Sequence, residues 1–354
     1  MALSLEASLR RPALSDAAVP RTYIRSREFD ATLLAAPIGA GLLAASVVAA
    51  DPRLYPFLLV ADLWLLGYHH VIATYTRLAF DTQSLRRNRF LAVDLLAIVT
   101  LMTLGIAVTA GAWVIATAFL YLQWFHYMRQ GYGIARMYFR ATADGQLPGS
   151  RDVAADFAIY LVPIYGIAAR SATMGDRFLG LPVKPLVLPD SIVTLLGALA
   201  AAAVVAWIAK TMRAALADTL DFQYTAFIAS HIAIFLVAYV FMNDVNGGWL
   251  AINVWHNFQY VLVVWMSNAR RYAGGVDPAA RFLSRLSQPG RVTMYFACCL
   301  AITTLIYAAI DRFTLLVLGG GMAVTIGIYM GINFHHYIVD ALIWKRRKAA
   351  PQAA

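Results

Sequence analysis

Charged residues and cysteines are both scarce in this chain. Only 14% of its 354 residues are charged, while 61% are hydrophobic and the mean hydropathy is +0.64. A chain so apolar cannot cover itself with a water-facing surface, which excludes a soluble globular domain of this size. The cysteines, Cys298 and Cys299, are adjacent within an apolar run, which excludes a disulfide framework and favours packing over a redox or metal role.

A secretory signal is also missing. Residues 1–29 contain five arginines but no compact apolar core followed by a small-residue cleavage site, so we expect this segment to be retained on the cytoplasmic side. The other basic residues alternate with apolar runs and form no basic domain. We therefore predict no nucleic-acid partner and expect the basic loops to attract anionic membrane lipid.

What the chain does contain is a series of long apolar runs. Because about 20 apolar residues cross a bilayer, these runs predict an all-α protein, a polytopic integral membrane helical bundle of about ten transmembrane helices. The predicted domains are a cytoplasmic N-terminal segment 1–29, a transmembrane helical domain 30–344 and a cytoplasmic C-terminal tail 345–354. The expected spans are 30–50, 54–78, 90–110, 112–139, 153–171, 188–210, 223–242, 249–269, 292–310 and 314–344.

The distribution of basic residues predicts the orientation of these spans. With the N-terminus inside, the external segments hold few of the 29 Lys and Arg residues, and Arg129 lies within a span. This asymmetry predicts an N-in/C-in topology, and we expect the membrane to be a bacterial inner (cytoplasmic) membrane. The external basic residues are Arg53, Arg170, Arg177, Lys184 and Arg312.

All seven histidines fall inside apolar runs. Ionisable side chains are costly in a bilayer and usually face the interior of a bundle, where they mark a site. A single histidine is more often a hydrogen-bond partner between helices than a ligand, but histidines on several helices can converge on a metal centre. The seven are His69, His70, His126, His231, His256, His335 and His336.

Polar residues at helical spacing accompany these histidines. His336 and Asp340 are four residues apart and share a helix face, while His256, Asn257 and Tyr260 lie on one stripe of the span 249–269. Hydrogen-bonding side chains are costly in lipid. They are therefore expected to line a site or an interhelical network.

Arg129 lies three residues after His126, well before the basic end of its span. A buried arginine needs an anion. The anion is either a carboxylate of the protein, such as Asp62 or Asp94, or an acidic group on a ligand, and the sequence leaves both open. Gly131 and Gly133 would permit close approach of a neighbouring helix or a local kink.

Counting back from the cytoplasmic ends of five spans places their histidines roughly 10–21 Å from the inner ends, at about 1.5 Å per residue. Because imidazole suits iron, copper and zinc, a common metal site is predicted. Which histidine of the pairs 69–70 and 335–336 ligates stays open. We favour His70, His126, His256 and His336 as ligands, then His69, His335 and Asp340, and lastly His231; Arg129, Tyr260 and Asn257 are the predicted catalytic residues.

Three functions fit such a centre. The favoured one is an oxidoreductase or oxygenase in which one or two non-haem iron ions activate dioxygen and oxidise a lipophilic small molecule from the bilayer, with an external electron donor. The second is a b-type haem protein of electron transfer, with two axial histidines and Arg129 beside a propionate. The third is a metal-ion or proton transporter, although the chain shows no inverted repeat.

The distribution of histidines is loosely similar to that of histidine-rich membrane desaturases, hydroxylases and carotenoid-cleaving oxygenases. The HxxxH and HxxHH boxes of the desaturases are absent. The similarity therefore concerns only the distribution of histidines, and we do not assign the chain to that group.

Overall fold

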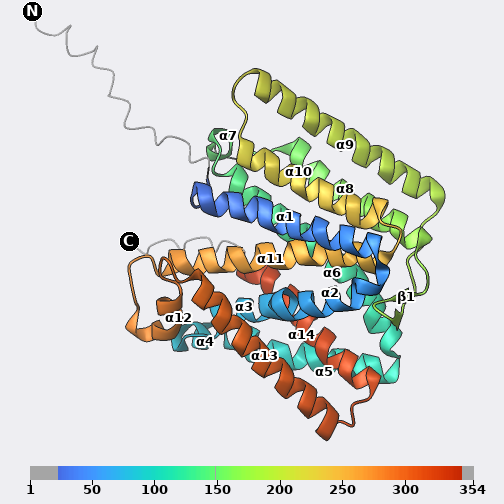
Figure 1. The fold of residues 1–354 in the computed structure, drawn as a ribbon, viewed down its shortest axis with the longest axis vertical. Helices are drawn as coiled ribbons and strands as arrows, with labels where there is room; N and C mark the ends of the chain where they lie inside the picture. Colours follow the sequence, from blue (N-terminus) through green and yellow to red (C-terminus); the bar gives the residue numbers. More distant parts are fainter. Residues whose placement is uncertain (1–22, 148, 345–354) are drawn as a thin grey trace, which may run out of the picture.

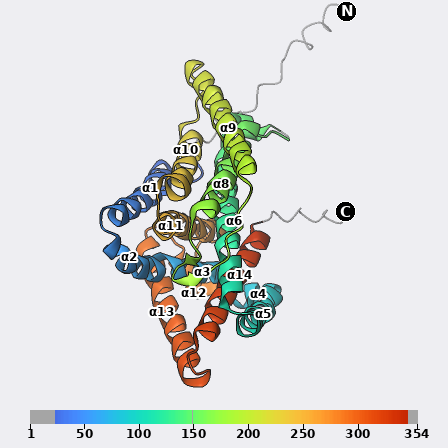
Figure 2. The ribbon, with the colours of Figure 1, turned by 90° about the vertical axis from the view of Figure 1, so that its right-hand side faces the viewer.

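The computed structural model describes residues 23–147 and 149–344, and most of them are helical (Figures 1 and 2). The prediction of an all-α protein is confirmed. Of the predicted terminal segments, 1–22 and 345–354 lie outside the described residues. A two-stranded antiparallel ribbon joins β1 (Arg177–Phe178) to β2 (Leu181–Pro182). The helices are α1 (Arg27–Ala50), α2 (Tyr55–Asp62), α3 (Tyr68–Leu78), α4 (Thr82–Arg89), α5 (Leu95–Thr109), α6 (Ala112–Phe139), α7 (Ala143–Gln146), α8 (Val153–Thr173), α9 (Asp190–Leu216), α10 (Phe222–Leu236), α11 (Val245–Arg271), α12 (Arg281–Leu286), α13 (Val292–Val317) and α14 (Met322–Ile343).

Seven helical segments of the described chain are long and apolar enough to cross a membrane, as expected of an integral membrane protein. They include α2 with α3, and α4 with α5, each pair forming one continuous span. Helices α6, α11 and α14 have 28, 27 and 22 residues but are not among the seven. These three helices carry His126, His256 and His336. The total of about ten spans therefore stays a prediction.

Helix α11 forms the centre of the bundle. It is buried along nearly its whole length and packs against α1, α3, α6 and α10. Helix α9 lies at the edge (Figure 2), where only Ala200, Ala203 and Trp207 are buried. Its remaining surface is almost entirely apolar, as expected for a helix in contact with lipid. The polar side chains of α11 consequently lie in the interior, remote from lipid.

Three of the described spans contain a π turn, in which one extra residue is inserted into the helix. The turns cover Leu63–Gly67, Phe90–Asp94 and Val237–Phe241. In the first, the Tyr68 N–H bonds the carbonyl of Leu63, five residues back. The extra residue delays the rotation of the helix by about 100°. Residues of α3 therefore face a different direction from the one an uninterrupted helix would give them.

The predicted boundary between the last two spans is wrong, because α13 extends through it and α14 begins only at Met322. Asp311 remains within the helix since its carboxylate accepts a hydrogen bond from the hydroxyl of Tyr329 at 2.7 Å. The chain reverses instead at Gly319 and Gly320, whose φ angles are 75° and 65°. Glycine adopts this left-handed conformation at little cost.

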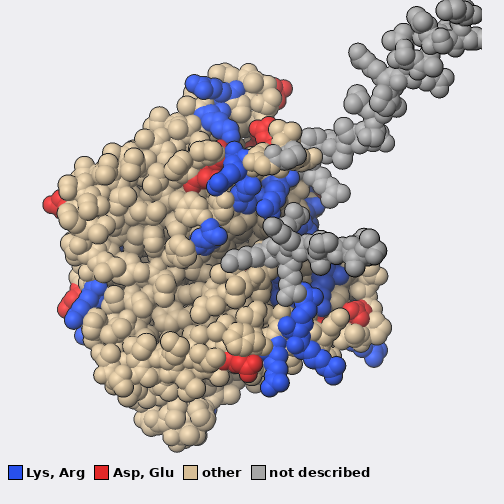
Figure 3. Space-filling view, turned by 180° about the vertical axis from the view of Figure 1, so that it is seen from behind, with Lys and Arg blue, Asp and Glu red and all other residues tan. Residues whose placement is uncertain are grey.

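Lys and Arg side chains gather at one end of the bundle (Figure 3). Helix α1 begins and α11 ends there, since Arg270 donates a hydrogen bond to the carbonyl of Ile24. Helix α3 ends there as well, because Asp81, just beyond it, pairs with Arg271 at 3.1 Å. We call this the basic end. Its charge is what the positive-inside rule expects of a cytoplasmic face, and the N-in/C-in orientation stays a prediction.

Candidate metal centre

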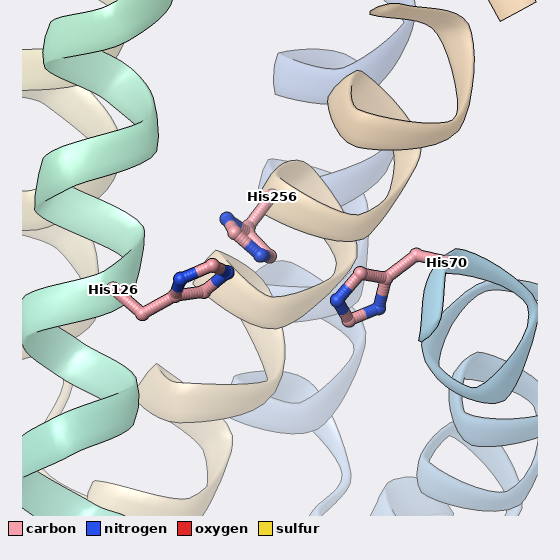
Figure 4. Close-up of side chains that lie close together, drawn as sticks. All are labelled: His70, His126 and His256. Atoms are coloured by element: carbon pink, nitrogen blue, oxygen red, sulfur yellow. The ribbon is translucent and has the colours of Figure 1, made fainter. Parts of the chain in front are cut away.

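Three histidines from three helices point toward one another in the interior (Figure 4). They are His70 of α3, His126 of α6 and His256 of α11, and one ring nitrogen of each lies within 4.8 Å of those of the other two. Their exposed fractions are 5, 6 and 0%. Three buried imidazole nitrogens at this spacing could hold a metal ion.

His336 of α14 completes the group. Its Nε2 lies 2.9 Å from Nε2 of His70, and its ring centroid lies 5.0 Å from that of His126. The ring is fully buried. We call His70, His126, His256 and His336 the histidine cluster. The structure thus brings together the four residues that the sequence favours as ligands, one from each of four helices.

The donor atoms of the cluster fit a metal ion. Among the described residues, neither ring nitrogen of His256 has a hydrogen-bond partner, and the same is true of Nε2 of His126 and Nδ1 of His70. An unsatisfied buried polar atom costs about 1–3 kcal/mol. An ion bound by the imidazoles would take up one nitrogen of each ring, which relieves part of this cost.

The π turn before α3 decides which histidine of the first pair faces the cluster. In an uninterrupted α-helix, His69 would point in the same direction as Asp62, seven residues earlier. Because the turn inserts one residue, His70 takes that direction instead. Both side chains in fact face α11, where Asn253 donates a hydrogen bond to Asp62 and the His256 ring lies 5.4 Å from that of His70.

His69 lies outside the cluster, on the side of α3 that faces α13. Its Nδ1 donates a hydrogen bond to the carbonyl of Leu65 at 3.2 Å, and its ring meets that of Phe296 edge-on at 5.4 Å. A carbonyl can only accept, so Nδ1 carries the hydrogen. His69 therefore packs two helices together.

His335 is bonded through both ring nitrogens. Its Nε2 donates to the carbonyl of Leu91 at 2.6 Å, and its Nδ1 accepts from the Tyr75 hydroxyl at 3.2 Å. Leu91 lies in the second π turn, where the Leu95 N–H bonds Phe90 instead of Leu91. His335 thus supplies a donor to a backbone carbonyl at a helix defect, and the structure places His336, not His335, in the cluster.

His231 also bonds a carbonyl at a helix defect. Pro163 of α8 has no N–H, so the carbonyl of Ile159, four residues earlier, loses its usual helical partner. The Nε2 of His231 donates to this oxygen at 3.2 Å. Its Nδ1 lies against Gly131, where an added Cβ would be only 2.4 Å away. The expected close approach at Gly131 is confirmed, and His231 lies outside the cluster.

Asp340 is linked to His336 of the histidine cluster through a series of hydrogen bonds. Its Oδ1 accepts hydrogen bonds from the hydroxyl of Tyr260, at 2.6 Å, and from the indole of Trp344. Tyr260 is 2.8 Å from the hydroxyl of Thr74, which is 2.9 Å from Nδ1 of His336. The structure therefore places Asp340 at the far end of a hydrogen-bond chain.

A second polar network lies on the opposite side of the cluster from the basic end. Asp62 accepts from Asn253, which in turn accepts from the hydroxyl of Tyr127. Among the described residues, Asp62 Oδ1 and both amide atoms of Asn257 are buried without a partner. Asn257, a predicted catalytic residue, follows His256 directly in α11 and is fully buried.

Arg129 lies on the exposed side of α6, outside the interior. It donates a hydrogen bond to the hydroxyl of Tyr160, and its guanidinium lies 5.3 Å from the ring centroid of Tyr132. Within the described residues no carboxylate forms an ion pair with it. Asp62, one of the two partners considered, is occupied by Asn253. Arg129 is thus not the buried arginine that the sequence suggested, so the expectation that it needs an anion is wrong.

Tyrosine rings enclose the cluster, and sequence reasoning overlooks two of them. Tyr127 lies 4.3 Å from the His256 ring, and Tyr337 stacks on His126 at 4.5 Å. Each of these tyrosines directly follows a cluster histidine in the sequence, at 126 or 336. A tyrosine next to a histidine is the available signal, but Tyr68, which precedes His69, shows the same pattern, so adjacency alone does not identify the tyrosines around the cluster.

Neither the family models nor the curated proteins nor the solved structures contain a match to this chain. Its function is therefore inferred from the histidine cluster and the residues around it.

Proposed function

We propose that this protein is a membrane-embedded oxidoreductase in which the histidine cluster binds non-haem iron and acts on a lipophilic substrate. The observation that supports it is the convergence of His70, His126, His256 and His336 from four helices. Neutral imidazole nitrogen is a donor that suits iron. Iron, when bound, would supply the binding and activation of dioxygen, with electrons from an external donor.

The residues of the chain would position the ion and keep water out. Three of the four imidazoles come from α6, α11 and α14. The packing of these helices places the ring centroid of His126 4.9 Å from that of His256 and 5.0 Å from that of His336. Tyr127 and Tyr337 cover the rings of His256 and His126. A site closed by aromatic rings excludes bulk water, which protects reactive species from side reactions.

A lipophilic substrate is supported by the position of the cluster inside apolar helices. His126 is the most exposed of the four rings, at 6%, and α6 also carries the exposed side chains of Phe125 and Arg129. If the substrate has an acidic group, Arg129 is the cation available to hold it.

A haem is less well supported. A porphyrin must lie between the two histidines that act as its axial ligands. The Nε2 atoms of His70 and His336 are 2.9 Å apart, so the rings touch without room for a porphyrin plane. A metal-ion transporter would need a series of ligand sites along a path, whereas the four histidines form a single group.

Elemental analysis and a visible spectrum of the detergent-purified protein test the proposal. Iron in stoichiometric amount without a Soret band is the expected result. A Soret band would establish the haem alternative, and a protein that retains and binds no metal would refute the proposal. His256→Ala should abolish the metal content while His231→Ala, which removes a buried histidine outside the cluster, should retain it.

A further inference from the structure

A chain of hydrogen bonds leads from the histidine cluster toward the basic end. It begins at Nδ1 of His336, passes through the hydroxyls of Thr74 and Tyr260 at 2.9 and 2.8 Å, and ends at Oδ1 of Asp340 at 2.6 Å. All four residues are buried, with exposed fractions no greater than 7%. Trp344 donates to the same Oδ1 from beyond.

The last two bonds fix the direction of the chain. The Trp344 indole has an N–H and no acceptor, so Oδ1 of Asp340 is an acceptor whether or not the carboxyl group carries a proton on Oδ2. Tyr260 must then donate its hydrogen to Oδ1. A hydroxyl has one hydrogen, so Tyr260 can only accept from Thr74.

The same reasoning carries the direction to the histidine. The Thr74 hydroxyl also lies 3.4 Å from the carbonyl of His70, but its hydrogen goes to Tyr260 at the shorter distance of 2.8 Å. The oxygen of Thr74 therefore accepts from His336. Nδ1 of His336 must therefore carry a hydrogen. In a neutral imidazole the other nitrogen is then a bare acceptor, and this is the Nε2 that faces His70.

We propose that Asp340, acting through Tyr260 and Thr74, holds His336 in the tautomer whose Nε2 lone pair faces the cluster, which makes His336 the fourth metal ligand. Asp340 is in this account a positioning residue and not a ligand. The role of His336 as a ligand rests on the proposed function, whereas its tautomer follows from the hydrogen bonds of the metal-free protein. Hydrogen bonds to the outer nitrogen of a ligating histidine commonly set its orientation and basicity.

One consequence concerns His70. In the metal-free protein, Nε2 of His336 can only accept, so Nε2 of His70 must donate across the 2.9 Å contact. His70 would then have to move its hydrogen to Nδ1, which has no partner among the described residues, before Nε2 could bind an ion. Metal binding should change the tautomer of His70 and leave that of His336 unchanged.

Solid-state NMR of the full-length protein in lipid, labelled with ¹⁵N-histidine, reads the tautomer directly. In metal-free wild type, the signals lost in His336→Gln should belong to a ring protonated at Nδ1 and bare at Nε2. Tyr260→Phe frees the Thr74 hydroxyl to donate either to Nδ1 of His336 or to the carbonyl of His70, 3.4 Å away, and should therefore populate the opposite tautomer in part. A wild-type His336 protonated at Nε2, or one unaffected by Tyr260→Phe, would overturn the proposal.

Zn²⁺ affinity, measured by competition with a chelator, gives a second readout that needs no assigned spectrum. Tyr260→Phe and Asp340→Leu should each weaken Zn²⁺ binding about 10–100-fold. Asp340→Asn keeps an acceptor oxygen and should bind as wild type does. If Asp340 were itself a ligand, Asp340→Asn would lose affinity as Asp340→Leu does, and the proposal would be wrong.

Tyr295→Phe is the matched control. Tyr295 is also a buried tyrosine beside a threonine of α3, since its hydroxyl lies 3.2 Å from that of Thr76. Within the described residues, neither member of this pair forms a hydrogen bond with a histidine. Tyr295→Phe should leave both the tautomer and the Zn²⁺ affinity unchanged, and a loss equal to that of Tyr260→Phe would refute the specific chain. If wild type binds no Zn²⁺, the proposed function fails, while the NMR experiment still decides the tautomer.

Discussion

The histidine pair 69–70 offers the sharpest comparison within the chain, because alanine can be placed at either of two adjacent positions. His70→Ala removes one of the four cluster imidazoles. Changes one layer further from a metal already cost 10–100-fold in affinity, so we expect a loss of at least about 100-fold, or about 2.8 kcal/mol. His69→Ala removes the bond to Leu65 and the contact with Phe296, and metal affinity should be retained.

Without metal, His69→Ala and His70→Ala should lower the free energy of unfolding by similar amounts. Each loses one hydrogen bond of a buried imidazole, which contributes about 0.5–1.5 kcal/mol. An ion at 100 times its dissociation constant adds about 2.7 kcal/mol to the stability of a protein that binds it. Wild type and His69→Ala should gain this increment, and His70→Ala should not.

Thermal unfolding in detergent, with and without anaerobic Fe²⁺, measures the increment, and dialysis followed by elemental analysis measures the bound metal. Equal binding by His69→Ala and His70→Ala would show that the π turn does not select between them. Loss of metal binding in His69→Ala alone would mean that His69, and not His70, faces the cluster.

Two further predictions concern the contacts of His231. His231→Ala should destabilise the protein by about 1–3 kcal/mol, because the carbonyl of Ile159 loses its donor. In a Pro163→Ala background the new backbone N–H can bond the carbonyl of Ile159, so His231→Ala should destabilise the protein less. Strictly additive effects of the two changes on the unfolding midpoint would contradict this expectation. Gly131→Ala forces a Cβ against His231 and should cost about 1–3 kcal/mol, whereas Gly133→Ala, which meets nothing within 4 Å, should be neutral or slightly stabilising; equal loss of stability in both would refute the packing assigned to Gly131.

The sequence predicts the class of the fold well because apolar length is a strong signal. The helices follow the apolar runs closely, except where a polar residue within a helix leads the sequence pattern to predict that the helix ends there. Asp311 interrupts hydropathy but not the helix, because Tyr329 bonds its carboxylate. Such a partner comes from the neighbouring helix and is invisible in the local sequence.

The distance of each histidine from the cytoplasmic end of its span was enough to predict that these histidines could meet. The sequence could not show which histidine of the pairs 69–70 and 335–336 joins the cluster. Helical spacing alone aligns His69 with Asp62, and the π turn that shifts this alignment has no recognised signature in LWLLG. His335 and His336 differ only in what lies around them, namely Leu91 on one side and His70 on the other. These neighbours are set by packing between helices.

Two of the three histidines outside the cluster, His231 and His335, have a consequence for how the bundle is assembled. Lipid chains are as apolar as the helices, so the hydrophobic effect does little to tell one neighbour from another. Pro163 and the second π turn each leave one backbone carbonyl without its usual helical N–H partner. His231 and His335, each from a different helix, donate the hydrogen bonds that these carbonyls accept. At these two breaks, the histidine therefore helps to determine which helix packs beside the freed carbonyl.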